Sequence, residues 1–167
     1  MIIILFDAAL IVTTLLCALV AGIVLGFAVV VMPGIATLSD RDFLLAFKRM
    51  DGIIQDGQPV FMIVWVGSII SVVTMVVLGT LQLSGVQLYL VWFVTGLYLF
   101  GVQAPTLRFN IPLNNAVQAL DVESLSESDL AKARSQFEVP WNRWNRFRTG
   151  AAIVSVIALL MLQMLMR

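Results

Sequence analysis

The stretch AALIVTTLLCALVAGIVLGFAVVVM (residues 8–32) decides the fold, because it contains no charged residue over a length sufficient to cross a bilayer. A helix needs about 20 mostly apolar residues to span the hydrocarbon core. Three further stretches meet this requirement, at residues 60–81, 86–104 and 149–166. We therefore predict an all-α protein, an integral membrane four-helix bundle that forms one membrane domain over residues 1–167, with extra amphipathic helices on the cytoplasmic side.

The composition excludes several functional classes. Of the 167 residues, 60% are hydrophobic and 12% are charged, whereas about a quarter of the residues of a soluble domain are charged. Ten Lys and Arg residues balance ten Asp and Glu residues, so nothing marks a nucleic-acid binder. His is absent and Cys17 is the only cysteine, which removes the usual metal, haem and paired-thiol sites. We expect no cofactor and no metal, and a buried Cys17.

The connections and their charges predict the orientation. Four spans place the two long connections, residues 33–59 and 105–148, on the same side of the membrane. These connections carry nine of the ten basic residues, namely Arg41, Lys48, Arg49, Arg108, Lys132, Arg134, Arg143, Arg146 and Arg148. Basic residues concentrate in cytoplasmic loops. We therefore expect a bacterial inner-membrane protein whose long connections are cytoplasmic and whose termini, with Arg167, are external.

Small residues recur at every fourth position in three of the spans. In lipid, apolar side chains gain little by meeting each other, so close backbone approach holds helices together. The small residues therefore predict a compact bundle in which these positions meet neighbouring helices: Ala18, Gly22 and Gly26 in the first span, Gly67 and Ser71 in the second, and Ala151 and Ser155 in the fourth.

The first long connection contains an amphipathic segment over residues 40–56. Phe43, Phe47, Met50 and Ile54 recur at helical spacing, which predicts a helix that lies against the bundle or in the membrane interface. This helix either seals the bundle or forms a lid over a pocket.

The second long connection begins with amides. Asn110 and Asn114 are four residues apart and face the same way if this stretch is helical. An amide offers a donor and an acceptor without charge, so these residues either cap helices or contact a ligand. Further along, Ser126 and Asp129 form a helix-start pattern that predicts a helix over residues 127–138, with Lys132 and Arg134 facing solvent.

The sequence PWNRWNRFRT (residues 140–149) leads directly into the fourth span. Pro140 either interrupts the preceding helix or opens the next one. In a single helix Trp141, Asn145 and Arg148 share a face, with Trp144 beside them. Trp and Arg are typical membrane anchors. On the inner face of a bundle, however, Arg148 needs partners, for which Asn110, Asn114 or a bound anion or carbonyl oxygen are candidates.

Taken together, these motifs resemble the anthrone-oxygenase-like family of small membrane proteins. The resemblance rests on four spans, Val-Met-Pro-Gly at residues 31–34, the helix bearing Met50, Asn-x-Pro-x-Asn at residues 110–114 and Trp-Asn-x-x-Arg-Thr at residues 144–149. It implies oxidation of an anthrone to an anthraquinone without metal or flavin. The chain departs from the family pattern at residues 50–54, where members often carry Met-Gln-x-Ile-Asn.

Three functions fit these residues, and the resemblance favours the first, an enzyme. In an enzyme acting on a lipophilic aromatic or quinol-like substrate, Trp141, Trp144 and Met50 would contact the substrate. Amides would bind its oxygens and Arg148 would stabilise an enolate or phenolate; the amides are Asn110, Asn114 and Asn145. The base would be Asp51, Asp56 or Glu138. The same pocket without chemistry would make a small-molecule or lipid-binding module. An accessory subunit, or a homo-oligomer, would use the small residues and the Trp-rich edge as its contact surface.

Overall fold

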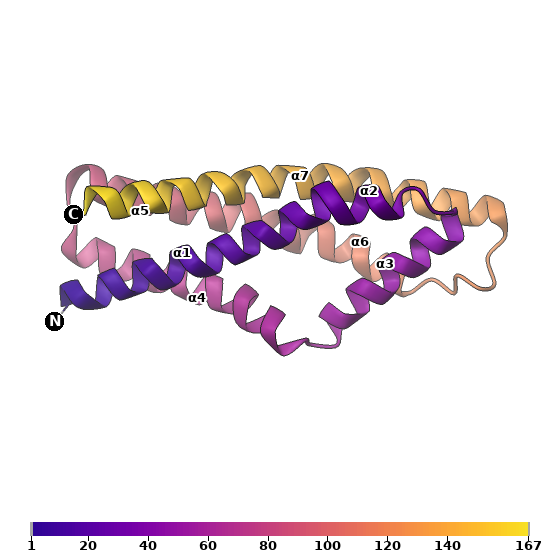
Figure 1. Ribbon diagram of the computed structural model, residues 1–167, viewed down its shortest axis with the longest axis horizontal. Coiled ribbons are helices and arrows are strands. Elements are labelled where there is room, and N and C mark those ends of the chain that lie inside the picture. Colours follow the sequence, from indigo (N-terminus) through magenta and orange to yellow (C-terminus); the bar gives the residue numbers. More distant parts are fainter. Residues whose placement is uncertain (1, 167) are drawn as a thin grey trace.

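The computed structural model describes residues 2–166, and their side chains from Ile4 onward. In that part of the chain every regular element is a helix (Figure 1). The elements, in chain order, are α1 (Ile2–Gly26), η1 (Phe27–Val31), α2 (Met32–Ile35), α3 (Asp40–Gln55), α4 (Pro59–Gln82), α5 (Gly85–Tyr98), η2 (Leu99–Gln103), η3 (Thr106–Asn110), α6 (Ile111–Gln118) and α7 (Glu127–Leu165). The elements labelled η are π-helical, with one more residue per hydrogen-bonded turn than an α-helix.

Four helical stretches are long and apolar enough to cross a membrane: Ile4–Ile35, Pro59–Gln82, Gly85–Gln118 and Glu127–Leu165. The predicted membrane helical bundle is therefore confirmed. At 1.5 Å per residue, the 39 residues of α7 extend about 58 Å, roughly twice the hydrocarbon thickness of about 30 Å. α7 thus projects beyond the bilayer. α3, α6 and the first half of α7 form this projecting part, which we call the connection end, opposite both termini (Figure 1).

α7 is continuous through Pro140. Its start is the predicted one, because the Ser126 side chain accepts a hydrogen bond from the backbone N–H of Asp129. Since Pro140 neither ends this helix nor begins another, Trp141 and Arg148 lie on one face of a single helix, and both are buried.

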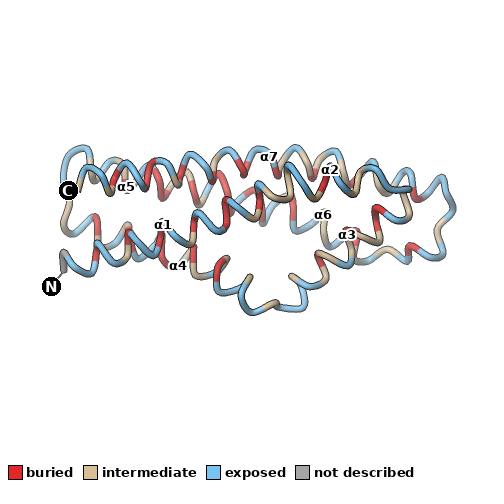
Figure 2. Tube along the Cα trace, in the orientation of Figure 1, coloured by how far each residue is buried: buried red, intermediate tan, exposed pale blue. Residues whose placement is uncertain are grey.

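Large side chains, rather than small ones, join α1 to its neighbours. Buried positions alternate with exposed ones along α1 (Figure 2). Cys17, Val20 and Val24 are among the buried residues, as predicted for Cys17. Ala18 and Gly22 are exposed instead, so the prediction that the small residues of the first span face other helices is wrong. The reason is that the small residues and the larger apolar side chains of α1 lie on different faces of the helix, and packing the face with the larger side chains buries more surface.

A close backbone approach occurs elsewhere. A Cβ atom added to Gly101 in η2 would lie 2.9 Å from the Cβ atom of Ala151 in α7, which is closer than real Cβ atoms approach. Ala151 belongs to the predicted small-residue pair of the fourth span, so in α7 the pattern does mark a helix contact. Gly101 lies in η2, where the π-helical turn brings the backbone of the third span against α7.

The Arg134 side chain ties α7 to the segment between α2 and α3. Arg134 Nη2 and Nη1 donate to the carbonyls of Ala36 (2.8 Å) and Leu38 (3.0 Å), and Nη1 also pairs with Asp40 (2.9 Å). The carbonyls at the end of a helix lack partners within it, and the fork of a guanidinium can bind several at once. The prediction that Arg134 faces solvent is therefore wrong.

Candidate functional site

A cavity of about 370 Å³ lies where α4 diverges from α1 and meets α3 (Figure 1). Most of its wall is apolar, with aromatic side chains from four helical stretches. One part of the wall is polar. The lining residues are Ile23, Val24, Phe27, Phe47, Asp51, Ile54, Phe61, Met62, Trp65, Val66, Ile69, Gln103, Thr106, Leu107, Asn110, Ile111, Asn114, Trp141 and Arg148. An apolar cleft with a few convergent polar groups is the usual form of a small-molecule site.

Prolines shape the polar part of this wall. Each of the three π-helical segments ends two residues before a proline: Pro33, Pro105 or Pro112. A proline has no N–H and its ring clashes with the carbonyl four residues back. The residue just before each proline donates its backbone N–H to the carbonyl five residues back, as Ile111 does to Thr106, and not to the carbonyl four residues back as in an α-helix. All three segments line the cavity, through Phe27, Gln103 and Asn110 among others.

Asp51 is the one acidic residue in the cavity wall. It projects from α3 and is 3% exposed. Three amide N–H donors reach its two oxygens: Asn114 Nδ2 at 2.6 Å, Gln55 Nε2 at 2.7 Å and Gln118 Nε2 at 2.9 Å. Asn114 in turn accepts from Trp141 Nε1 at 2.8 Å. α3, α6 and α7 are therefore tied together through a carboxyl group that borders the cavity.

Arg148 is buried on the same cavity without a carboxylate partner among residues 2–166. Its Nε donates to Asn145 Oδ1 and its Nη1 to Thr106 Oγ1, both at 3.0 Å. The guanidinium carbon lies 5.6 Å from the centre of the Trp141 ring. Because these partners are all neutral, the positive charge of Arg148 is uncompensated and faces the cavity.

Two buried polar atoms in the cavity wall have no hydrogen-bond partner in the described part of the chain: Asn110 Oδ1 and Gln103 Nε2. Both side chains are at least 95% buried, and buried polar groups are normally hydrogen-bonded. Asn110 Oδ1 offers an acceptor and Gln103 Nε2 a donor. A ligand with a hydroxyl group and a carbonyl oxygen would satisfy both.

The structure brings together four of the seven side chains that the sequence suggested as site residues: Asn110, Asn114, Trp141 and Arg148 all line the cavity. Asn145 lies behind Arg148, and its Nδ2 donates to the backbone carbonyl of Val24 at 3.1 Å. The partners of Arg148 are Thr106 and Asn145, not Asn110 or Asn114.

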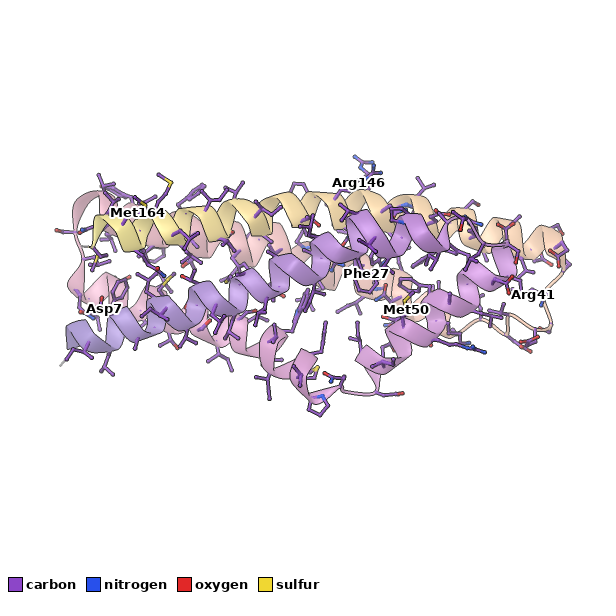
Figure 3. The ribbon with its side chains drawn as sticks, in the orientation of Figure 1. Asp7, Phe27, Arg41, Met50, Arg146 and Met164 are labelled. Carbon is purple, nitrogen blue, oxygen red and sulfur yellow. The ribbon has the colours of Figure 1, made fainter. Side chains whose placement is uncertain are left out.

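The other two lie outside the cavity lining. Trp144 stacks on Phe109 with 3.7 Å between the ring centres and borders a separate shallow pocket. Met50 is partly exposed (Figure 3). Neither is among the residues that line the cavity.

Sequence reasoning left Asp51 as one of three candidate bases and did not consider Gln103. Asp51 follows Phe43 and Phe47 at intervals of four and therefore continues the buried face of α3. A carboxylate on the apolar face of an amphipathic helix is a signal that could have singled it out. The other two candidates differ: Asp56 is exposed, and Glu138 pairs with Arg134.

Comparison with known proteins identifies the family. A family model described as anthrone oxygenase matches residues 53–158. This region includes α4, η2, η3 and most of α7, and begins two residues after Asp51. No curated protein and no solved structure matches the chain. Because the family model covers more than half of the chain, the protein belongs to the anthrone oxygenase family.

Proposed function

We propose that this membrane protein is an oxygenase that oxidises a lipophilic aromatic ketone or quinol, of the anthrone type, without a metal or flavin. The observation that carries the proposal is the polar wall of an otherwise apolar cavity, where Asp51 and Arg148 line the same space as Gln103 and Asn110, each of which has a buried polar atom without a partner. Membership of the anthrone oxygenase family supports the reaction class.

Different parts of the cavity wall bind different parts of the substrate. Aromatic side chains, among them Phe27, Phe61 and Trp141, offer surfaces for a flat ring system. Gln103 Nε2 and the Arg148 guanidinium donate to a substrate carbonyl oxygen. Asn110 Oδ1 accepts from a neighbouring hydroxyl group. These contacts use the polar atoms that the protein leaves unpaired.

The chemistry begins with removal of a proton. Asp51 takes a proton from the acidic CH₂ group of the substrate, and the negative charge delocalises onto the carbonyl oxygen, where Arg148 stabilises it. The resulting anion transfers electrons to O₂ and forms a C–O bond, and the peroxide oxygen takes a proton back from Asp51. Loss of water then gives a new carbonyl. In sum, one CH₂ group and one O₂ become one C=O group and one water.

Other residues act indirectly in this proposal. Asn145 is a positioning residue, because it holds Arg148 Nε and is itself fixed to the backbone of α1. Asn114 positions Asp51 and links it to Trp141. Met50 and Trp144 make no contact with the substrate. We also propose that the connection end faces the cytoplasm of a bacterial inner membrane, since the two long connections, residues 33–59 and 105–148, carry nine of the ten basic residues.

Oxygen uptake tests the proposal. The purified protein in lipid nanodiscs is offered a panel of anthrones and hydroquinones, and uptake is compared with protein-free nanodiscs. We expect uptake above this blank for at least one anthrone, and a loss of about 100-fold or more in Arg148→Gln, in line with removal of an oxyanion-stabilising donor. The matched control is Arg143→Gln, an exposed arginine of the same helix outside the cavity, which should retain the wild-type rate.

The alternative is a non-catalytic protein that binds a lipophilic small molecule or lipid in the same cavity, or serves as an accessory subunit. Saturable binding of anthraquinones with no oxygen uptake above the blank across the panel would establish the binding module. Absence of both binding and uptake would refute the proposed site and leave the accessory role.

A further inference from the structure

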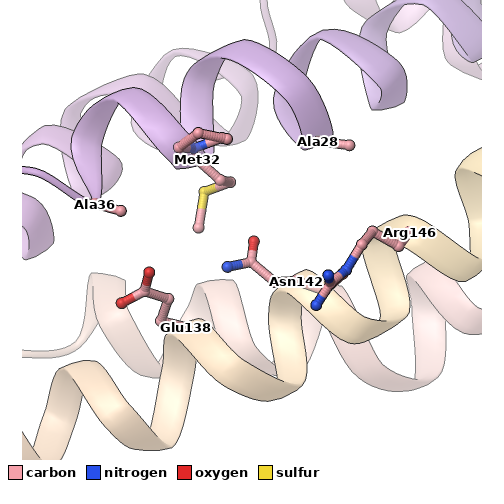
Figure 4. A pocket seen from close by; sticks show the side chains of 7 residues that line it. Ala28, Met32, Ala36, Glu138, Asn142 and Arg146 are labelled. Atoms are coloured by element: carbon pink, nitrogen blue, oxygen red, sulfur yellow. The ribbon is translucent and has the colours of Figure 1, made fainter.

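A second, smaller cavity of about 160 Å³ lies between α7 and the η1–α2 stretch (Figure 4). We call it the interfacial slot. Its lining residues are Ala28, Met32, Pro33, Ala36, Glu138, Asn142 and Arg146. None of them lines the large cavity, so an inference about the slot does not depend on the proposed oxygenase activity.

The two walls of the slot differ in chemistry. On α7, Glu138, Asn142 and Arg146 follow one another at intervals of four residues and so lie along one face. Figure 4 shows Asn142 between the two charged side chains. On the opposite wall Met32 extends toward α7 (Figure 4). On either side of it the side chains of Ala28 and Ala36 end at Cβ, which leaves space there.

The polar groups of the slot have spare hydrogen-bonding capacity. Glu138 uses Oε2 to bind Arg134 Nε at 2.8 Å, and Oε1 has no partner among the hydrogen bonds of the described residues. The Asn142 side chain likewise makes none. Arg146 uses only Nε, in a 3.3 Å contact with the Asn142 backbone carbonyl. Free acceptors therefore lie at one end of the slot and free cationic donors at the other.

The slot lies at the edge of the lipid-facing surface. Val29 and Val30 beside it on η1 are 60% and 66% exposed, and Phe147 next to Arg146 is 55% exposed. Arg146 projects from the outer side of the bundle (Figure 3), at the point where α7 becomes apolar. An arginine at this depth extends toward lipid phosphates. The slot is thus placed at the level of lipid headgroups, with apolar surface beside it for acyl chains.

We propose that the interfacial slot binds the phosphoethanolamine headgroup of a phospholipid. The phosphate pairs with the guanidinium of Arg146. The ammonium group donates to Glu138 Oε1 and to the side-chain oxygen of Asn142. A choline headgroup fits less well, because its three methyl groups leave no N–H to donate and add bulk in a narrow slot. A glycerol headgroup keeps the phosphate contact and lacks the cationic one.

Native mass spectrometry of the detergent-solubilised protein tests this assignment. The protein is incubated with equal amounts of ethanolamine, choline and glycerol phospholipids that carry the same acyl chains. We expect at least about tenfold more ethanolamine than choline phospholipid on the wild-type protein, since the two hydrogen bonds of the ammonium group distinguish them. Arg146→Gln should lower binding of all three lipids. Arg143→Gln, on the same helix outside the slot, should change none.

Two further variants separate the slot from the stability of the fold. Glu138→Gln should lower the preference for ethanolamine over choline, because the negative charge is lost, and leave the glycerol lipid bound as before. Because Glu138 also pairs with Arg134, Ala28→Leu provides a second test. It fills the slot without changing any charge, and should abolish lipid retention while the thermal unfolding temperature stays at or above the wild-type value.

Equal retention of ethanolamine and choline lipids by the wild type would overturn the proposal, as would an effect of Arg143→Gln equal to that of Arg146→Gln. Soluble glycerophosphoethanolamine distinguishes the source of the headgroup. If it displaces the lipid at comparable concentration, the slot binds a free phosphoethanolamine compound and the lipid assignment is wrong. If it does not compete, the acyl chains contribute and the lipid is the ligand.

Discussion

Replacing Asp51 by Asn tests the structural part of the site most sharply, because the substitution keeps the side-chain size and removes only the charge and one acceptor. The carboxyl group is 3% exposed and receives three amide N–H groups. Asn114 reaches Oδ1, and Gln55 and Gln118 both reach Oδ2. An asparagine has one oxygen, so in either orientation its NH₂ group meets at least one of these donors.

The cost follows from this arrangement. If the new amide keeps its oxygen toward Gln55 and Gln118, its NH₂ group opposes Asn114 Nδ2. Asn114 cannot turn its oxygen to accept, since that oxygen already accepts from Trp141. One hydrogen bond to a charged acceptor is lost and two become neutral. Each hydrogen bond to a charged group contributes about 1.5–3 kcal/mol, so we expect a loss of about 2–4 kcal/mol in the free energy of unfolding.

Denaturant titration in detergent micelles, followed by circular dichroism, measures this loss. The control is Asp56→Asn, an exposed carboxylate one residue beyond the end of the same helix, which should stay within about 0.5 kcal/mol of wild type. A loss for Asp51→Asn as small as that of the control would contradict this prediction. It would mean that the three amides do not require a carboxylate acceptor at this position.

Three further substitutions and one topology measurement follow. Asn145→Leu, which keeps the branching and the number of side-chain heavy atoms, should cost about 1.5–3 kcal/mol in denaturant titration because it leaves Arg148 Nε unpaired; full stability would contradict the positioning role. Trp141→Phe removes the donor to Asn114 together with part of a buried ring system and should cost at least about 1 kcal/mol, whereas no change would show that neither the bond nor the lost ring contacts contribute. Pro112→Ala restores an N–H and should let η3 return to α-helical bonding, which weakens anthraquinone binding without lowering thermal stability. A reporter fused to the C-terminus should read external and one in the connection before α7 cytoplasmic; the reverse pattern would overturn the orientation.

The membrane part of the fold was predictable because bilayer thickness constrains it directly. A run such as residues 8–32 must be helical and must cross, whatever its neighbours do. The neighbours of each helix were harder to predict. Ala18 and Gly22 carry the pattern that marks a helix contact in α7, yet both are exposed, since side-chain volume on the adjacent face of α1 decides which face is buried.

The candidate site was predictable only in part, for a related reason. Trp141 and Arg148 share a face in any continuous helix, so α-helical spacing alone places them together. The burial of Asp51 depends on α6 packing against α3, a contact between segments more than 60 residues apart. Gln103 reaches the cavity through η2, a π-helical segment. A proline follows each π-helical segment by two residues, but a proline in a sequence does not by itself predict a π-helical turn.

Anaerobic hydrogen exchange tests the proposed role of Asp51, removal of a proton from an aromatic substrate held in the large cavity, before any oxygen reacts. The protein is incubated with an anthrone in D₂O without O₂, and deuterium at the CH₂ group is followed by mass spectrometry. We predict exchange well above the protein-free rate for wild type and for Asp56→Asn, and exchange at the protein-free rate for Asp51→Asn. Exchange in Asp51→Asn as fast as in wild type, or none above the protein-free rate in wild type, would contradict the account.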